Sequence, residues 1–380
     1  MDNNRSTQGD LSTHSVVDLF AGPGGIDVAA IWLGMNSHGI EWDDEANATR
    51  VEAGLDTDHC DVRTLGPKSF PKATILAGGP PCQTFTVAGS GSGRGALADV
   101  VQLVKRMARF EDVSSALAHL DDERTGLVVE PLRWILEAWE AGRPFEAVVL
   151  EQVQTVLPVW EAMKPVLEML GYKVVCAVLR TEEFGVPQTR RRAVLLANRT
   201  VAPILPVPTH QTYSAGMVRG TGESHLLPWE TMGSALGRGK WFEVVSNYGS
   251  GGVPSARGRR TSEQPSATVT GKISRNRIVD HLGAEQARFS SAEAGRLQTF
   301  PLNYPWADAG WAQQVGNAMP PRLAVHALAA AFGRVPVTAH LDRKVAGSWN
   351  RSRSNGRPVS TQVPDLRVEG ALDLGAALAI

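Results

Sequence analysis

The feature that most constrains the fold is an alternation of short apolar runs with helix-like stretches between residues 15 and 198. Strand-like runs include SVVDLF, ATILAGG, EAVVLEQV, KVVCAVL and RRAVLLA, and helix-like segments such as IDVAAIWLGM and VWEAMKPVLEMLG lie between them. Strands that alternate with helices usually form a mostly parallel sheet with helices on its faces. The sequence therefore predicts an α/β fold for this part of the chain.

The remainder of the chain changes character twice. Residues 200–287 are rich in Pro, Gly, Ser and Thr with little periodicity, as in PVPTHQTYSAG and SNYGSGGVPSARGRR, and this predicts a small loop-rich domain. Helical patterning returns in SAEAGRLQTF and RLAVHALAAAF. We expect a main domain formed by residues 12–199 and 288–335, a second domain between them, and a poorly ordered tail at 336–380.

Composition argues against several classes of protein. The 380 residues are 43% hydrophobic, enough to bury a substantial core, yet no apolar run approaches the length of a membrane span. The polar start MDNNRSTQGD lacks the apolar stretch of a secretory signal. The cysteines Cys60, Cys82 and Cys176 show no CxxC spacing, which indicates neither a disulfide framework nor a structural zinc site. We expect a cytoplasmic protein with no membrane partner.

The charge of the chain is unevenly distributed. Its formal net charge is -1, but the stretch from Arg238 to Arg277 holds eight basic and two acidic side chains, a local charge of +6 against -7 elsewhere. Basic residues of this stretch include Arg257, Arg259, Arg260, Lys272 and Arg275. Local charge decides whether a protein attracts a polyanion, but a solvated loop surface is the simpler alternative. Charge alone leaves both interpretations open.

A glycine turn near the start of the chain is a candidate ligand site. The run VVDLFAGPGG leads from a strand into the helix IDVAAIWLG, which would place a helix N-terminus beside a ligand. The spacing of Gly22, Gly24 and Gly25 differs from the GxGxxG of dinucleotide enzymes. A tight turn without a ligand therefore stays open at this point.

Acidic residues follow the glycine turn at two predicted strand ends. Glu41 in GIEWDDEA is placed to accept the hydroxyls of a ribose, and Trp42 beside it offers an apolar face. Asp61 in HCDVRTL is placed to accept a hydrogen bond from an adenine amino group. Each acid alone is more simply a surface residue. Together with the glycine turn they favour a cofactor that carries adenosine.

Chemically reactive residues end two further strands. Cys82 in GGPPCQ follows the rigid Pro80–Pro81 and precedes the glycine-rich GSGSGRG, where a buried core cysteine would be unusual. Glu151 ends the strand EAVVLEQV, so it should open onto the same edge of the sheet. This pattern indicates a nucleophile with a hinged flap facing a carboxylate.

A basic motif, QTRRR, precedes the last strand of this region. Gln188, Arg190 and Arg192 occupy alternating positions, so we expect their side chains to share one face. An exposed basic edge is the simpler alternative. Beside a nucleophile and a carboxylate, such arginines favour binding of a carbonyl oxygen or a phosphate.

The order of these motifs resembles that of the DNA (cytosine-5) methyltransferase family of prokaryotic or phage type. The resemblance covers residues 15–333 and rests on DLFAGPGG, GGPPCQ, LEQV, QTRRR, RLQTFP and QQVGNAMPPRLA. Any one of these motifs is weak evidence, but all six in the order of the family are specific. The resemblance implies a Rossmann-like S-adenosylmethionine-dependent methyltransferase fold, with residues 200–287 as a target recognition domain.

The resemblance also implies roles for individual residues. Cys82 would be the nucleophile, Glu151 and Arg192 would hold the target cytosine, and Arg190 would be a supporting charge. The cofactor pocket would be lined by Phe20, Gly22, Gly24, Gly25, Glu41, Trp42, Asp61, Pro80 and Asn317. Substrate contacts would come from Gln83, Gln188, Arg257, Arg259, Arg260, Lys272 and Arg275.

The implied reaction uses S-adenosylmethionine, yields S-adenosylhomocysteine and needs no metal. The implied partner is double-stranded DNA, together with a cognate restriction endonuclease if the chain serves restriction-modification, and the protein would act as a monomer. One departure from the family pattern is Gln152, where the family usually has Asn after the glutamate. A transfer RNA cytosine-5 methyltransferase and a non-catalytic DNA-binding protein are the alternatives. The glycine spacing disfavours a nicotinamide oxidoreductase.

Overall fold

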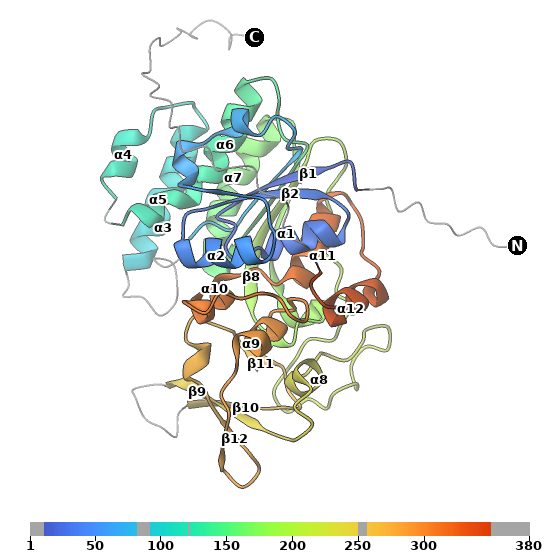
Figure 1. Ribbon diagram of the computed structural model, residues 1–380. Coiled ribbons are helices and arrows are strands. Elements are labelled where there is room, and N and C mark those ends of the chain that lie inside the picture. The colour runs from blue at the N-terminus through green and yellow to red at the C-terminus, as the bar shows by residue number, and fades with distance from the viewer. Residues whose placement is uncertain (1–10, 82–91, 121, 250–256, 351–380) are drawn as a thin grey trace, which may run out of the picture.

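The computed structural model describes residues 11–81, 92–120, 122–249 and 257–350 (Figure 1). Within them, one seven-stranded sheet has the order β3-β2-β1-β4-β5-β8-β6. Its strands are β1 (Ser15–Leu19), β2 (Asn36–Glu41), β3 (Thr57–His59), β4 (Ile75–Gly78), β5 (Ala147–Val153), β6 (Lys173–Arg180) and β8 (Arg191–Asn198). Only β8 runs antiparallel to its neighbours. The predicted mostly parallel α/β sheet is confirmed.

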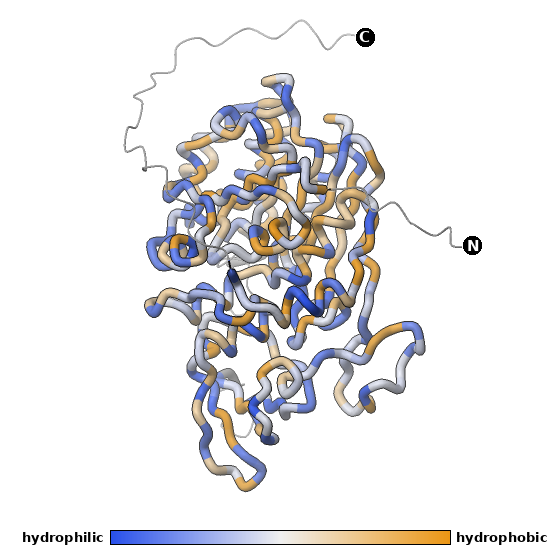
Figure 2. The backbone as a smooth tube through the Cα atoms, turned by 45° about the vertical axis from the view of Figure 1, so that its right-hand side comes forward, coloured by the Kyte–Doolittle hydropathy of each residue, from blue (hydrophilic) through white to orange (hydrophobic). Residues whose placement is uncertain are grey.

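Helices cover both faces of this sheet. One face packs against α3 (Ser92–Met107), α6 (Glu130–Glu140) and α7 (Leu157–Met169), and the other against α1 (Gly25–Trp32) and α11 (Pro321–Ala331). Alternating residues of β5 show the division, because Val148 and Leu150 join the first core and Val149 joins the second. The apolar colouring of the central strands in Figure 2 reflects burial on both faces.

Shorter elements complete the larger domain. Its remaining helices are α2 (Asp44–Glu52), α4 (Ser114–Ala118), α5 (Glu123–Gly126), α9 (Ser291–Leu297), α10 (Trp311–Asn317) and α12 (Thr338–Ala346). Single 3-10 turns occur at η1 (Val62–Thr64), η2 (Pro67–Ser69), η4 (Leu127–Val129), η5 (Gln154–Val156) and η6 (Thr181–Phe184). Several of these turns follow the carboxyl ends of strands, so they shape the edge at which the candidate site lies.

The second domain is built on an antiparallel sheet that the sequence did not reveal. Its strand order is β10-β9-β12-β13, and it lies at the lower end of the molecule in Figure 1. Its elements are α8 (Met232–Leu236), β9 (Glu243–Gly249), β10 (Arg257–Thr261), η9 (Ile273–Arg275), β12 (Arg277–Val279) and β13 (Glu285–Gln286). A two-stranded sheet of β7 (Gln188–Thr189) and β11 (Ser266–Ala267) links the two domains.

The second domain does not close its core alone. Val244 and Ile278 from its sheet, and Phe242 just before β9, pack with Leu297 of α9 and Val315 of α10. Both helices come from the chain that follows the domain in sequence. The two domains therefore share an apolar core across their junction.

The beginning of the C-terminal tail is ordered, contrary to our expectation for residues 336–380. Leu341 of α12 is 2% exposed, and Asp342 forms an ion pair with Arg322 at 2.6 Å. The indole Nε1 of Trp349 donates to the carbonyl of Ala53 at 2.9 Å. These few anchors are too widely spaced to produce a sequence pattern. Residues 351–380 lie outside the described residues.

A buried ion pair supports the first half of the sheet. Arg50 of α2 is fully buried, and its Nη1 lies 2.7 Å from Oδ2 of Asp27 in α1. Its Nε donates to Oγ1 of Thr57 at 2.8 Å. Burial raises the pKa of Asp18 in β1 well above its usual value, and Asp27 adds to this effect. Arg50 thus provides the positive charge of a buried cluster with two carboxyl groups.

Replacing Arg50 by Met should destabilise the fold by about 3–5 kcal/mol, because Asp27 would remain buried without its partner. Urea denaturation followed by circular dichroism measures this free energy of unfolding. The matched control is Lys164→Gln, which breaks the exposed pair with Glu168 and should cost less than about 1 kcal/mol. Equal effects of the two substitutions would contradict the assigned role of Arg50.

Candidate active site and cofactor pocket

The carboxyl end of β5 presents a buried acid paired with a base. Glu151 is 5% exposed and Arg192 of β8 is 9% exposed. Arg192 Nε lies 2.6 Å from Oε1 of Glu151, at ion-pair distance but without the alignment of a hydrogen bond. Antiparallel pairing of β5 with β8 places these side chains together. The pair offers a carboxylate and a guanidinium to one small planar ligand.

Gln152 connects the Glu151–Arg192 pair to the Pro80–Pro81 segment that follows β4, here called the proline turn. Its side chain is buried, and its Nε2 donates a hydrogen bond to the carbonyl of Pro80. The amide that replaces the usual Asn of the family therefore joins the end of β5 to the Pro-Pro segment after β4. The predicted nucleophile Cys82 and its neighbour Gln83 lie outside the described residues.

The glycine turn after β1 has the backbone geometry that its sequence requires. Phe20, Gly22 and Gly24 all have positive φ, at 59°, 53° and 100°. A Cβ on Gly25 would lie 2.1 Å from the carbonyl oxygen of Met319, so only glycine allows this approach of α1 to the segment after α10. The turn is thus fixed by the two ends of the larger domain.

Glu41 braces this turn from the end of β2. Its Oε2 accepts a hydrogen bond from the backbone N–H of Gly22 at 2.6 Å. Its Oε1 accepts from the N–H groups of Trp42 and Asp43 at 2.9 and 2.7 Å. Trp42 itself is 69% exposed. The structure therefore brings Glu41 to the glycine turn and leaves an exposed indole beside it.

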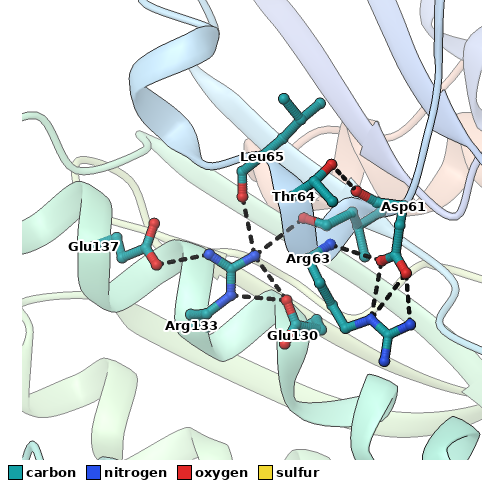
Figure 3. A network of polar contacts seen from close by, with 8 residues as sticks. Asp61, Arg63, Thr64, Leu65, Glu130, Arg133 and Glu137 are labelled. Atoms are coloured by element: carbon teal, nitrogen blue, oxygen red, sulfur yellow. Dashed lines mark hydrogen bonds and ion pairs between the residues drawn. The ribbon is translucent and has the colours of Figure 1, made fainter. Parts of the chain in front are cut away.

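Asp61 lies on the loop that follows β3 (Figure 3). Its carboxylate accepts hydrogen bonds from the backbone N–H and the guanidinium of Arg63, at 2.8 and 2.6 Å. Against the opposing effect of partial burial, these bonds lower the pKa of Asp61. Arg133 of α6 fixes the same loop by donating to the carbonyls of Val62 and Leu65, both at 3.1 Å. Asp61 is thus an ionised group on a loop that hydrogen bonds from Arg133 hold in place.

Asn317 ends α10 near the glycine turn. It stands two residues before Met319, whose carbonyl meets Gly25. Its Oδ1 accepts a hydrogen bond from Nε2 of Gln313 at 2.8 Å. The residues expected at the cofactor pocket therefore come from the end of β2, from the segments that follow β1, β2, β3 and β4, and from the end of α10.

The sequence analysis missed the buried charged residues beside the glycine turn. Arg50 donates to the carbonyl of Gly22 at 3.4 Å, and Asp18 has one oxygen, Oδ1, without a hydrogen-bond partner in the described structure. The sequence partly indicated this buried cluster, because the acidic residues Asp18 and Asp27 interrupt the apolar runs VVDLF and IDVAA. Buried carboxyl groups need a partner, but no local pattern marks Arg50 as that partner.

The expectation for the basic motif is wrong in part. Gln188 is fully buried, with Nε2 donating to the carbonyl of Leu297 and Oε1 accepting from the N–H of Val269, both at 3.0 Å. Arg190 is 2% exposed and donates to the carbonyls of Val269 and Gly316, both at 2.9 Å. Both side chains therefore make interdomain contacts, and Gln188 is too deeply buried for the substrate contact expected of it.

The expected alternation itself is present, because Gln188, Arg190 and Arg192 are buried, whereas Thr189 and Arg191 between them are more exposed. The three side chains differ in where they lie along this run. Gln188 of β7 and Arg190 contact residues at the domain junction, and Arg192 of β8 lies at Glu151.

The predicted basic stretch is partly neutralised in the folded protein. Arg259 pairs with Glu243 of the neighbouring strand, Arg277 pairs with Glu285, and Arg238 pairs with Glu293 of α9. Lys272 and Arg275 are exposed, and Arg257 and Arg260 are half-buried. The charge that faces a polyanion is therefore smaller than the sequence suggests.

Two observations limit the kinds of site in the described parts of the chain. No group of three or more His, Cys, Asp or Glu side chains is arranged there to hold a metal ion. No helix there has the length and apolar character needed to cross a membrane.

Comparison with known proteins identifies the family of this chain. A family model described as C-5 cytosine-specific DNA methylase matches residues 14–110 and 114–216. The chain is 30% identical over 275 residues to the type II methyltransferase M1.HphI of Haemophilus parahaemolyticus, which covers 67% of this chain and 66% of that protein. It is 26% identical over 327 residues to M.AplI of Arthrospira platensis, covering 81% and 83% of the two chains.

Solved structures show the same fold. The S. pombe Dnmt2 methyltransferase matches with a TM-score of 0.53 and 16% sequence identity, over 83% of this chain and 97% of that one. The family match spans more than half of the present sequence and includes the glycine turn, the Pro-Pro-Cys segment, Glu151 and Arg192. The chain therefore belongs to the C-5 cytosine-specific DNA methylase family and is a DNA (cytosine-5) methyltransferase.

Proposed function

We propose that this enzyme uses S-adenosylmethionine to methylate carbon 5 of a cytosine that is flipped out of a specific duplex sequence. The observation that carries the proposal is the buried Glu151–Arg192 pair, which Gln152 connects to the proline turn that precedes Cys82. Stacking and pairing hide carbon 6 of cytosine in a duplex, so the base must leave the helix to meet these groups.

The side chains divide the chemistry between them. The Cys82 thiolate donates an electron pair to carbon 6 of the ring, which makes carbon 5 nucleophilic enough to accept a methyl group. Glu151, carrying a proton, donates it to ring nitrogen 3 as the thiolate adds and accepts a hydrogen bond from the amino group, while Arg192 donates to the carbonyl oxygen. After methylation the carbon-5 proton passes to water or hydroxide, and Cys82 leaves as the ring double bond re-forms. No metal is needed for these steps.

The cofactor pocket proposed here fits an adenosine-bearing molecule. The positive-φ turn at Phe20, Gly22 and Gly24 leaves the backbone open to a ligand, and Glu41 stands at the adjacent strand end as an acceptor for ribose hydroxyls. Asp61 would accept from the adenine amino group, and Trp42 would cover the ring. Gly25, Pro80 and Asn317 would complete the walls. When bound, S-adenosylmethionine supplies an electrophilic methyl group.

The biological setting proposed is restriction-modification. The relatives M1.HphI and M.AplI are named type II methyltransferases. A cognate restriction endonuclease that cuts the unmethylated sequence would then be the functional partner. The enzyme would act on duplex DNA as a monomer.

The decisive assay incubates the purified protein with labelled S-adenosylmethionine and either unmethylated duplex DNA of mixed sequence or total RNA. Nucleoside analysis then identifies the product. Label in DNA as 5-methylcytosine is the expected result. Label confined to RNA would overturn the choice of substrate, and label in neither would contradict catalysis.

Cys82→Ser should abolish methylation, and Glu151→Gln should slow it by about 100- to 10,000-fold, because the amide cannot transfer a proton to ring nitrogen 3. Single-turnover transfer of labelled methyl groups measures both effects. Cofactor affinity should be unchanged in each variant, and Glu161→Gln on the exposed face of α7 is the control. Normal turnover by either active-site variant would refute its assigned role.

The double variant Lys272→Gln, Arg275→Gln should weaken DNA binding on all sequences, because it removes two exposed cations of the second domain. The slope of log affinity against log salt should become shallower by up to about 2. The matched control is Lys68→Gln with Lys72→Gln. It removes the same charge from exposed residues before the amino end of β4, whereas the candidate site lies at the carboxyl ends of the strands. An identical loss in the control would show that only overall charge matters.

A further inference from the structure

A groove of about 650 Å³ lies between the two domains, next to the Glu151–Arg192 pair. We call it the interdomain groove, and the lining residues on which the argument depends are Arg180, Glu182, Arg191, Arg192, Tyr213 and Arg260. Burial raises the pKa of Glu182 to about 7, so this acid only partly offsets the arginines at neutral pH. The interdomain groove is therefore cationic and suits a nucleic acid strand.

Arg260 and Tyr213 form a stacked pair on the second-domain side of this groove. The guanidinium carbon of Arg260 lies 4.5 Å from the centroid of the Tyr213 ring. The Tyr213 ring in turn meets the Trp229 ring edge-on, with centroids 5.4 Å apart and an interplanar angle of 88°. A guanidinium that lies over an aromatic ring is attracted to the face of the ring, and its N–H groups remain available to donate hydrogen bonds.

The segment that carries Tyr213 is anchored to the larger domain. Oγ1 of Thr212 donates to Oε1 of Glu183 at 2.6 Å, and the backbone N–H of His210 donates to the Glu183 carbonyl at 3.0 Å. Glu183 belongs to η6, which follows β6 of the catalytic sheet. The stacked pair is therefore held at a fixed position relative to the Glu151–Arg192 pair.

Arg260 differs from its basic neighbours in its partners. Successive residues of a strand point to opposite faces, and the adjacent Arg259 turns to Glu243, with Nε 3.0 Å from Oε1. The guanidinium of Arg260 has no hydrogen bond or ion pair within the described ranges. Arg260 therefore lines the interdomain groove with its guanidinium over the Tyr213 ring and without a polar partner in the described ranges.

We propose that Arg260, stacked on Tyr213, is a specificity-determining residue that reads a guanine in the recognition sequence. A planar guanidinium donates two parallel hydrogen bonds to O6 and N7 of guanine, the only base edge in the major groove with two adjacent acceptors. Arg180 and Arg191 line the same groove and supply charge for phosphates. The inference rests on the proposed function, because it needs duplex DNA in this groove.

The test uses unmethylated genomic DNA of mixed sequence as the probe. The DNA is treated with wild-type or variant enzyme, and methylated cytosines are mapped at base resolution. The wild-type sites should share a guanine at one fixed position. Arg260→Gln should reduce the preference for guanine at that position by about 5- to 150-fold while the other positions stay selective.

Matched variants separate base reading from charge and folding. Lys240→Gln, which removes an exposed cation of the same domain just before β9, should leave the recognised sequence unchanged. Arg260→Lys keeps the charge but loses the planar fork, so it should relax the same position even if the Gln variant is poorly folded. Tyr213→Phe should preserve the preference, and Tyr213→Leu should weaken it.

Two results would overturn the inference. One is a wild-type recognised sequence without a fixed guanine. The other is an Arg260→Gln enzyme that slows equally on all sites with an unchanged sequence, because that pattern marks a phosphate contact. A wild-type enzyme that leaves DNA unmethylated would instead overturn the proposed function and this inference with it, so the two failures are distinguishable.

Discussion

The buried guanidinium of Arg50 joins segments on which the proposed cofactor pocket depends. It binds Asp27 in α1, Thr57 in β3 and the carbonyl of Gly22 in the glycine turn. A full charge in a dry environment is stable only when its partners stay in place. The glycine turn after β1, helix α1 and the start of β3 are therefore coupled through one side chain.

A second set of buried polar contacts couples the domains. Gln188 and Arg190 donate to backbone carbonyls at Leu297, Val269 and Gly316. Backbone acceptors do not change with side-chain rotamer, so these bonds fix the second domain against the sheet edge. Since Arg192 stands two residues beyond Arg190, the run that anchors the junction also carries the guanidinium proposed to bind the target base. The junction and the Glu151–Arg192 pair thus share one support.

Sequence patterns predicted the features that depend on local order. The strand and turn at 15–25 and the strand ending at Glu151 were recognisable, because apolar runs and glycines act within a few residues. The pairing of Arg259 with Glu243 was not, because strand register brings together residues far apart in sequence. The burial of Gln188 was missed for the same reason. The antiparallel sheet was missed because its short strands carry little alternation.

The shared core at the junction has a consequence for the modularity of the enzyme. Val244 and Ile278 of the second domain pack against Leu297 and Val315, which belong to the chain after it. A segment cut at the sequence boundaries near residues 200 and 287 would expose half of this core. The proposed recognition domain is therefore not a self-contained unit: a chimaera of two such enzymes would need to transfer the matching faces of α9 and α10 as well.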